Sequence, residues 1–376
     1  MPEEKPGLIL TINYGGGGGE YGIARVDTGE VIEQSKRPIA LPVDIEKQLE
    51  PRQRDFDNWA NERSILLGGY PHGPVRIVVA RGPAIKPDAK GQPNNFGIYS
   101  ITPDVIRAIE KRHLVTVHGS QFSAIVANQF AQRFGVPGIF RDPISCLQLP
   151  RSGALTGHPE ILFLGLGHWL NIAEALEEVH FGQRNWHDLN IVACHFGTGF
   201  TIAAFMKGHL KRVNNANAGG PPSDARAGEL PTEGLIDLVF TRIAEGESAQ
   251  DIKNELQGRC GLFGLTGAKD LQAVYKLIND GNGNAAEAYE IDIERIGEEI
   301  ARRYVNLDGH VDGLLLTGGM VSSERFVTDV TERVSFLTGA TEICVVPGSR
   351  EMAAMVRAAR SVILYGAKPI PYGPLS

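Results

Sequence analysis

Cysteine, positive charge and long apolar runs are all scarce in this chain, and each scarcity excludes a class of protein. The four cysteines, Cys146, Cys194, Cys260 and Cys344, lie far apart and form no C-x-x-C pair, which disfavours a disulfide framework or a zinc site. The formal net charge is -7 at pH 7 and no dense Lys/Arg run is present, which argues against nucleic acid as a partner. No apolar stretch approaches the length that spans a bilayer, so we expect no membrane segment.

The remaining composition is that of a globular protein. Hydrophobic residues make up 42% of the chain and charged residues 22%, with no signature of a disordered tail. A chain of 376 residues is too long for one ordinary core, which suggests two domains. The start, M-P-E-E-K-P-G-L-I-L-T-I, carries acidic residues and only a short apolar strand, so we expect no signal peptide. Together with the scattered cysteines, this favours a cytoplasmic location.

The most informative stretch is a strand that ends in a histidine and a glycine turn. An apolar, β-branched run leads to His195 and to the tight turn Gly197-Thr198-Gly199, and a second apolar run follows. Glycines at such a turn let backbone N–H groups approach an anion, and the hydroxyls of Thr198 and Thr201 can add further donors. The alternative is a plain β-hairpin that binds nothing.

Polar residues downstream of this hairpin could complete an anion site. Asn214, Asn215 and Asn217 precede a Gly-Gly-Pro-Pro break, and Arg226 lies in an A-R-A-G turn. A guanidinium group offers a planar fork of donors that matches a phosphoryl group. The alternative is an ordinary polar loop.

The opening of the chain repeats the strand–glycine–strand pattern. The strand Leu8–Ile12 is followed by Asn13, by the five glycines Gly15–Gly19, and then by Glu20. Five glycines can present N–H groups to an anion, but folding must overcome their large conformational freedom. The alternative is a disordered hairpin tip without a role.

Further motifs follow in a fixed order along the chain. They are A-R-G-P-A-I-K-P from Ala80, H-G-S-Q-F-S-A-I from His118, V-A-C-H-F-G-T-G-F-T-I from Val192, L-L-L-T-G-G-M from Leu314 and V-V-P-G-S-R-E-M-A-A-M from Val345. They resemble R-G-G-L-L-x-P, H-A-S-N-L-G-A-I, V-A-H-L-G-G-G-I-S-V, I-L-T-G-G-I and V-Y-P-G-E-x-E-M-x-A-L of the acetate and butyrate kinase family. The resemblance runs from about residue 8 to residue 365 and is to the butyrate kinase branch.

This resemblance implies the fold. The fold class is α/β, a two-domain duplicated actin-like ATPase fold of the ribonuclease H-like type, and the recurrence of the glycine-tipped hairpin is what such a duplication looks like in sequence. The expected domains are residues 1–157, with the C-terminal helix 353–376 packing back onto them, and residues 158–352, the nucleotide-binding domain. The family's habit of pairing implies a homodimer.

The resemblance also implies the site residues. The residues expected to act on the transferred group are Arg81, His118, His195 and Arg226. Those expected to bind the nucleotide and its phosphates are Asn13, Gly15, Gly197, Thr198, Gly199, Asn215, Gly318 and Gly319. Those expected to direct Mg²⁺ are Asp142 and Glu351. Alternatives stay open for three of them: His118 could serve a helix N-terminus, Asp142 could cap a turn before Pro143, and Glu351 could cap the last helix.

The implied activity is phosphoryl transfer between ATP, with Mg²⁺, and a short-chain carboxylate such as butyrate or a branched acid. A carboxylate needs no general base to attack, and the arginines would stabilise charge on the transferred group. One departure from the family bears on this activity. The family's opening hairpin reads I-N-P-G-S-T-S-T-K, whereas here Glu20 stands at or near the lysine position, where a carboxylate would repel phosphate. The alternative is a diverged member that binds nucleotide with little or no transfer.

Overall fold

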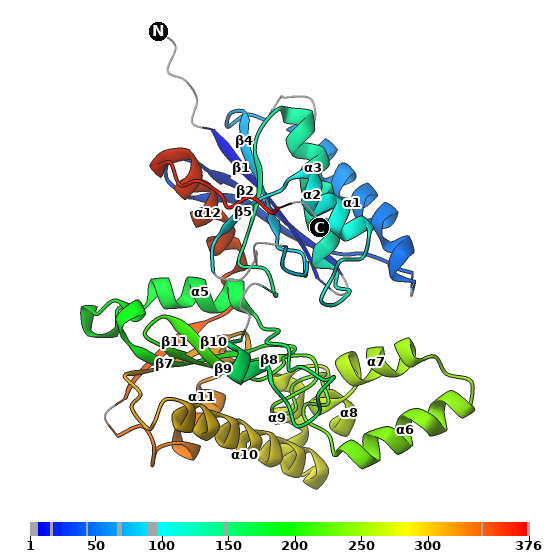
Figure 1. Cartoon of the computed structure of the whole chain (residues 1–376), viewed down its shortest axis with the longest axis vertical. Coiled ribbons are helices and arrows are strands. Elements are labelled where there is room, and N and C mark those ends of the chain that lie inside the picture. Colours follow the sequence, from blue (N-terminus) through cyan, green and yellow to red (C-terminus); the bar gives the residue numbers. More distant parts are fainter. Residues whose placement is uncertain are drawn as a thin grey trace. The chain divides into compact units, whose positions relative to one another are not determined.

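The computed structural model describes residues 7–15, 18–42, 44–65, 70–88, 96–145, 149–339 and 341–373. The chain divides into two compact units, here called unit 1 (Met1–Leu147 with Glu351–Ser376) and unit 2 (Gln148–Arg350) (Figure 1). The domain boundaries expected from the sequence, after residues 157 and 352, stay a prediction. Each unit is described by itself.

Unit 1 is built on a mixed sheet with the strand order β3-β2-β1-β4-β6-β5. The first three strands pair antiparallel, β4 pairs parallel with both β1 and β6, and β5 is antiparallel to β6. The strands are β1 (Leu8–Tyr14), β2 (Gly18–Arg25), β3 (Val31–Pro38), β4 (Val75–Arg81), β5 (Ile98–Ser100) and β6 (Gly138–Arg141).

Helices cover both faces of this sheet, as the continuous apolar runs of β1 and β4 require. Leu10 and Ile12 of β1 belong to the core beneath α1, α2 and α3. Thr11 points to the other face, where its hydroxyl meets the sulfur of Met352 on α12 at 3.1 Å. In Figure 1, α12 lies on the opposite face of this sheet from α1, α2 and α3. The helices are α1 (Leu49–Glu62), α2 (Pro103–Glu110), α3 (Ser120–Phe134) and α12 (Glu351–Tyr365).

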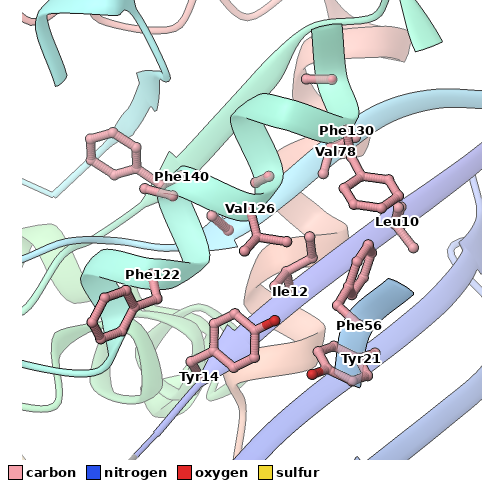
Figure 2. Packing of buried hydrophobic residues seen from close by; sticks show 14 of the residues in the cluster. Leu10, Ile12, Tyr14, Tyr21, Phe56, Val78, Phe122, Val126, Phe130 and Phe140 are labelled. Carbon is pink, nitrogen blue, oxygen red and sulfur yellow. The ribbon is translucent and has the colours of Figure 1, made fainter. Parts of the chain in front are cut away.

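A chain of aromatic rings fixes the β1–β2 hairpin against the helices (Figure 2). The ring centroids of Tyr14 and Tyr21 lie 5.8 Å apart, those of Tyr21 and Phe56 5.1 Å, and those of Phe56 and Phe130 4.3 Å, all edge to face. The Tyr14 hydroxyl donates to the carbonyl of Arg52 at 2.7 Å. Edge-to-face pairs add to the burial of apolar area, so the hairpin that carries Asn13 is held rigidly.

Unit 2 repeats the topology of unit 1. Its sheet has the order β11-β10-β7-β8-β9, in which β7, β8 and β9 pair antiparallel and β10 pairs parallel with both β7 and β11. The series β9-β8-β7-β10-β11 therefore corresponds to β3-β2-β1-β4-β6, which is the duplication expected from the two glycine hairpins. The strands are β7 (Asn190–Phe196), β8 (Phe200–Met206), β9 (His209–Val213), β10 (Gly313–Gly318) and β11 (Glu342–Pro347).

The faces of this second sheet are also both covered. Val192 and Cys194 of β7 belong to the core with α8 to α11, whereas α5 packs against β7 and β10. The helices of unit 2 are α4 (Arg151–Ala154), α5 (Trp169–Glu178), α6 (Thr232–Ala244), α7 (Ala249–Gly258), α8 (Gly261–Thr266), α9 (Leu271–Asn279), α10 (Gly283–Asn306) and α11 (Glu324–Arg333). Over the described part of the chain, no helix is both long and apolar enough to cross a membrane.

The core of unit 2 contains an ionisable group in an unfavourable place. Asp292 on α10 is 1% exposed, and neither carboxylate oxygen has a hydrogen-bond partner among the described residues. Burial, and then the nearby Asp224, raises the pKa of Asp292 well above its usual range. Burial first, and then Asp270, raises the pKa of Asp224 to about 6. Folding therefore favours the protonated form of Asp292.

Replacing Asp292 with asparagine should stabilise the protein at neutral pH. Below the unfolded pKa both states of the parent are protonated, and Asp292 has no pH-dependent cost. Above it the unfolded chain releases a proton that the folded chain retains, so stability falls as pH rises, by about 1.4 kcal/mol per unit of pKa shift. We expect the melting temperature of Asp292→Asn to exceed that of the parent by an amount that grows from pH 4 to pH 7. Asp280→Asn, an exposed residue at the end of α9, is the control, and a pH-independent difference for Asp292→Asn would contradict the prediction.

Candidate functional site

A row of polar side chains crosses one face of the unit 1 sheet. In the strand register Asn13 of β1 lies opposite Glu20 of β2, and Glu20 lies opposite Lys36 of β3. Residues directly opposite each other point to the same face. Asn13 Nδ2 donates to Glu20 Oε2 at 3.0 Å, and Lys36 Nζ lies 3.6 Å from Glu20 Oε1. The sheet therefore aligns a lysine, a carboxylate and an amide.

Arg81 and Glu351 extend this row at the carboxyl end of β4 and the first residue of α12. Asn13 Nδ2 also donates to Glu351 Oε2 at 2.6 Å. Arg81 Nη2 lies 3.3 Å from Glu351 Oε1, and Arg81 Nη1 donates to Asn13 Oδ1 at 3.4 Å. The side chains of Arg81 and Glu351 are only 14% and 11% exposed. The Asn13 amide thus connects two carboxylates and one guanidinium.

These side chains line an open cavity of about 330 Å³ within unit 1. Two carboxylates and three cationic side chains contribute to its wall, so it is suited to a small charged ligand and not to an apolar one. Arg37, one of the cations, is paired with Asp55 at 3.0 Å and with Glu62 at 3.1 Å. The lining residues are Asn13, Gly15, Gly18, Gly19, Glu20, Lys36, Arg37, Pro38, Arg81 and Glu351.

The ends of the glycine hairpin are held by a buried arginine on α1. Arg52 is 0% exposed, and its Nη2 donates to the carbonyl of Gly15 at 3.0 Å while its Nη1 donates to that of Gly18 at 3.4 Å. Its guanidinium carbon lies 5.1 Å from the centroid of the Tyr14 ring. Burial lowers the pKa of Arg52, but an arginine remains charged. Gly16 and Gly17 lie outside the described residues, so the expectation that the whole loop binds an anion stays a prediction.

His118 lies beside this hairpin at the start of α3. Its Nδ1 accepts the backbone N–H of Ser120 at 3.1 Å and lies 3.0 Å from the Ser120 hydroxyl. A Cβ on the intervening Gly119 would meet the carbonyl oxygen of Gly15 at 2.5 Å, so the chain here passes close to the glycine turn. These contacts fit the helix N-terminal role. The role on a transferred group stays a prediction.

Asp142, one of the two residues expected to direct Mg²⁺, has a completely covered side chain. Its Oδ1 accepts the N–H of Gly97 at 2.6 Å, and its Oδ2 accepts Nε of Arg141 at 2.8 Å. Arg141 also donates to the carbonyl of Ala354 in the first turn of α12. Asp142 therefore helps to fix the helix that carries Glu351.

In unit 2 the corresponding strand end carries His195. The register pairs His195 of β7 with Thr201 of β8 and with Thr317 of β10. The ring of His168 stacks on that of His195 with centroids 4.5 Å apart, and His168 Nδ1 lies 2.8 Å from the Thr201 hydroxyl. His195 is 6% exposed. Two histidines and a threonine thus form one compact group at the edge of the sheet.

Arg226 is seated against the glycine turn that joins β7 and β8. A Cβ at Gly199 would lie 2.0 Å from Nη1 of Arg226, so only glycine leaves room for the guanidinium. Nη1 of Arg226 donates to the carbonyl of Ala216. The hydroxyl of Ser223 donates to the carbonyl of Thr198 at 2.7 Å, which ties the loop containing Arg226 to the turn. The structure therefore brings Thr198, Gly199 and Arg226 together.

Asparagines shape the loop that leads to Arg226. Asn214 Oδ1 accepts the N–H of Ile202 at 2.6 Å, and its Nδ2 donates to the carbonyl of Phe200 at 3.0 Å, so Asn214 fastens the loop to β8. Asn215 Oδ1 accepts the N–H of Asn217 at 2.9 Å, an Asx turn. The contacts of Asn215 are thus with its own loop, and its binding of a nucleotide stays a prediction.

The glycine pair at the end of β10 lies next to the histidine group. Gly318 has φ +105°, and a Cβ there would meet the carbonyl oxygen of Phe196 at 2.2 Å, so this position requires glycine. Gly319 has open space around the position of a Cβ. Strand ends of this kind collect ligands in open α/β sheets. Of the residues predicted in unit 2, His195, the Gly197–Gly199 turn, Arg226, Gly318 and Gly319 meet at one sheet edge.

Comparison with known proteins shows what the chain is similar to. Residues 171–346 match the model of the acetokinase family. "Probable butyrate kinase 2" of Caldanaerobacter subterraneus subsp. tengcongensis is 27% identical over 331 residues, which cover 87% of this chain and 88% of that protein. "Butyrate kinase 2" of Clostridium acetobutylicum is 26% identical over 361 residues, 94% of this chain and 96% of that protein. Part of the chain thus matches the acetokinase family, and most of its length is similar to butyrate kinases, as its motifs predicted.

A solved structure supports the fold. The acetate kinase of Porphyromonas gingivalis superposes with a TM-score of 0.70 at 17% identity, over 95% of this chain and 100% of that one. At this identity the likeness concerns the fold alone. The predicted fold class, a two-domain duplicated actin-like ATPase fold, is confirmed.

Two residues that contribute to the site, Arg52 and Lys36, escaped the sequence analysis. Arg52 and Lys36 come from α1 and β3, and neither shows a local sign of its position because both reach the site through long-range packing. Thr201, which the sequence analysis named as a possible donor, lies directly opposite His195 in the hairpin, and its hydroxyl contacts His168. Among the described residues, no three His, Cys, Asp or Glu side chains are arranged to hold a metal ion.

Replacing Arg52 with methionine should loosen the glycine hairpin. The variant loses the bonds to Gly15 and Gly18, each worth about 1 kcal/mol. We expect the melting temperature to fall by about 4 to 8 °C in thermal unfolding followed by circular dichroism. Arg54→Met on the same helix, where the side chain is 69% exposed, is the matched control and should change little. Equal melting of the two variants would show that Arg52 does not anchor the loop.

Proposed function

We propose that this protein transfers a phosphoryl group reversibly between ATP and a short-chain carboxylate, giving an acyl phosphate and ADP. The observation that carries the proposal is Arg226, whose guanidinium is seated against the Gly199 turn in a chain that aligns with butyrate kinases over most of its length. Phosphoryl transfer asks a protein mainly to position its reactants and to stabilise charge, and a carboxylate attacks without a general base.

The unit 2 groups are suited to phosphates. In the proposal, the N–H groups of the Gly197–Gly199 turn and the guanidinium of Arg226 bind phosphoryl oxygens, with the imidazole of His195 donating to the same group. Gly318 and Gly319 let the backbone at the end of β10 approach the nucleotide closely. Donors fixed before the reaction stabilise the transition state without reorganising.

The unit 1 groups are suited to an anion and to a hard cation. Arg81 would bind a phosphoryl or carboxylate oxygen from its place in the cavity wall. Glu351 and the amide oxygen of Asn13 are the oxygen donors that Mg²⁺ prefers, and Mg²⁺ is usually held by one or two carboxylates, waters and substrate phosphates. Bound there, Mg²⁺ would neutralise charge on the phosphates. Because Asp142 is engaged with Gly97 and Arg141, its share in holding the ion rests on the family resemblance alone.

The alternative, a nucleotide-binding protein without efficient transfer, is not favoured. The carboxylate of Glu20 was the reason to consider this alternative, but it is paired with Lys36 and Asn13. Residue Glu20 is 9% exposed. The two relatives reported above are named as butyrate kinases. We also propose a cytoplasmic location, because ATP is supplied there and because Cys194, Cys260 and Cys344 are free thiols.

Replacing Arg226 with alanine should abolish transfer without unfolding the protein. Loss of an arginine that stabilises the transferred group lowers kcat by about 10³-fold or more. The measurement is trapping of acyl phosphate with hydroxylamine over a panel of short carboxylates. Gly199→Ala should lower kcat by about 10²-fold, because its Cβ displaces the Arg226 guanidinium.

The controls for these variants are Arg107→Ala on α2, where the side chain is 57% exposed, and Gly283→Ala at the first residue of α10, where a Cβ would meet nothing within 4 Å. Both should retain parental activity. Parental kcat in Arg226→Ala, with unchanged melting, would exclude the proposed role of Arg226. Absence of acyl phosphate with every acid, in folded parent protein that binds ATP, would exclude the proposed activity.

We further propose that the chain forms a homodimer through α6. Residues 236, 240 and 243 lie on one face of this helix, and none of the residues of α6 is buried. Ile236, Phe240 and Ile243 are 49%, 71% and 46% exposed. An apolar helix face of this kind favours association with another protein surface.

Replacing Phe240 with aspartate should convert the dimer to a monomer, because the charge would have to be buried without a partner. Sedimentation velocity at micromolar concentration distinguishes the two species. Val305→Asp on α10, where the valine is 74% exposed, is the control and should leave the dimer intact. A monomeric parent protein would refute the dimer.

A further inference from the structure

The three cationic side chains of the unit 1 cavity differ in how firmly they are held. Arg81 contacts Glu351 and Asn13, and Arg37 pairs with Asp55 and Glu62. Either guanidinium can meet an anion only from its place in the cavity wall, because turning it away would break these contacts. The ion pair of Lys36 is looser, because its Nζ lies 3.6 Å from Glu20 Oε1 and 71% of its side chain is exposed.

The strand register directs Lys36 toward the cavity. Lys36 lies opposite Glu20, and Glu20 lies opposite Asn13, so the three side chains share a face of the sheet. All three line the cavity together with Arg81 and Glu351. The four-carbon stem of lysine lets its ammonium move several ångström while β3 stays fixed.

Glu20 is held in place more firmly than Lys36. Its Oε2 accepts from Asn13 at 3.0 Å and its Oε1 from Nε2 of Gln34 at 2.5 Å, and the residue is 9% exposed. These neutral donors retain the carboxylate when the ammonium leaves. Glu20 therefore keeps the Lys36 ammonium near the cavity, and the ammonium can still leave Glu20 for a ligand.

We propose that Lys36 is an anion-binding residue of the unit 1 cavity, whose ammonium turns from Glu20 to a phosphoryl oxygen of the substrate. Contact with a phosphoryl group rests on the proposed function. The cationic charge that the glycine hairpin lacks is supplied from the neighbouring strand. No bond to the substrate is made or broken by Lys36; it contributes charge and one or two hydrogen bonds.

Two measurements on the full chain test this role. The first is the KM for acetyl phosphate in the ADP-phosphorylating direction. The second is the Kd for inorganic phosphate, measured by ³¹P NMR with ADP saturating so that the nucleotide's own phosphate site is filled. The variants are Lys36→Ala, Lys36→Glu and the exchanged pair Glu20→Lys with Lys36→Glu. Lys47→Ala, an equally exposed lysine that pairs with Asp44, is the control.

We expect Lys36→Ala to raise both the KM and the Kd about tenfold and Lys36→Glu to raise them further, with unchanged melting. The exchanged pair should recover to within about threefold of the parent, because it restores a lysine to the same row. Lys47→Ala should match the parent. Parental Kd and KM in Lys36→Ala would overturn the proposal, as would an exchanged pair no better than Lys36→Glu while equally stable.

The test separates this inference from the proposed function. If the parent makes no acyl phosphate yet binds inorganic phosphate in a way that depends on Lys36, the anion site stands and the proposed activity fails. If the parent is an active kinase and Lys36→Ala changes neither constant, the activity stands and the role of Lys36 is refuted.

Discussion

The pairing of one central strand in each sheet determines where every candidate group lies. β1 and β7 each pair antiparallel with the next strand in sequence and parallel with a strand that comes much later. This double pairing brings a hairpin turn and the end of a parallel strand to the same edge of the sheet. Asn13 thereby comes within reach of Arg81, and His195 lies beside Thr317. If the pairing register of either strand shifted by one residue, each of these polar side chains would point into an apolar core.

Buried charge in unit 1 makes that edge a costly arrangement. Removing Arg81 and Glu351 from water is unfavourable, and their attraction offsets the cost only if further hydrogen bonds satisfy both groups. The Asn13 amide provides them, because it donates to Glu351 and accepts from Arg81. Such a network adds little to stability, but it fixes the geometry of the groups around a ligand. The cavity is therefore preorganised by polar contacts, while its rigidity comes from the aromatic core beneath β1 and β2.

Sequence patterns predicted the parts of this fold that are uniform along the chain. Apolar runs beside a glycine turn marked β1 and the β7–β8 hairpin, and the family resemblance marked the C-terminal helix that is α12. β3 was missed because V-I-E-Q-S-K-R-P is polar and exposed at alternate positions, and a strand of that composition depends on its neighbour for its structure. Lys36 was missed with it. Motif order located His195 and Arg226, whereas the contact of Arg226 with Gly199 reaches across β8, β9 and the loop that follows them, and could not be derived from local pattern.

The duplicated halves use an arginine at the glycine hairpin in different ways, and this difference explains the charge distribution in each. In unit 1 the arginine is Arg52, which is wholly buried and donates to the carbonyls of the hairpin, so its charge maintains the backbone and does not face the cavity. In unit 2 the arginine is Arg226, which is partly exposed and lies on the turn itself. Unit 2 therefore needs no other cation at its hairpin. Unit 1 needs a further cation at its hairpin. Its sheet provides two, Arg81 at the end of β4 and Lys36 on β3.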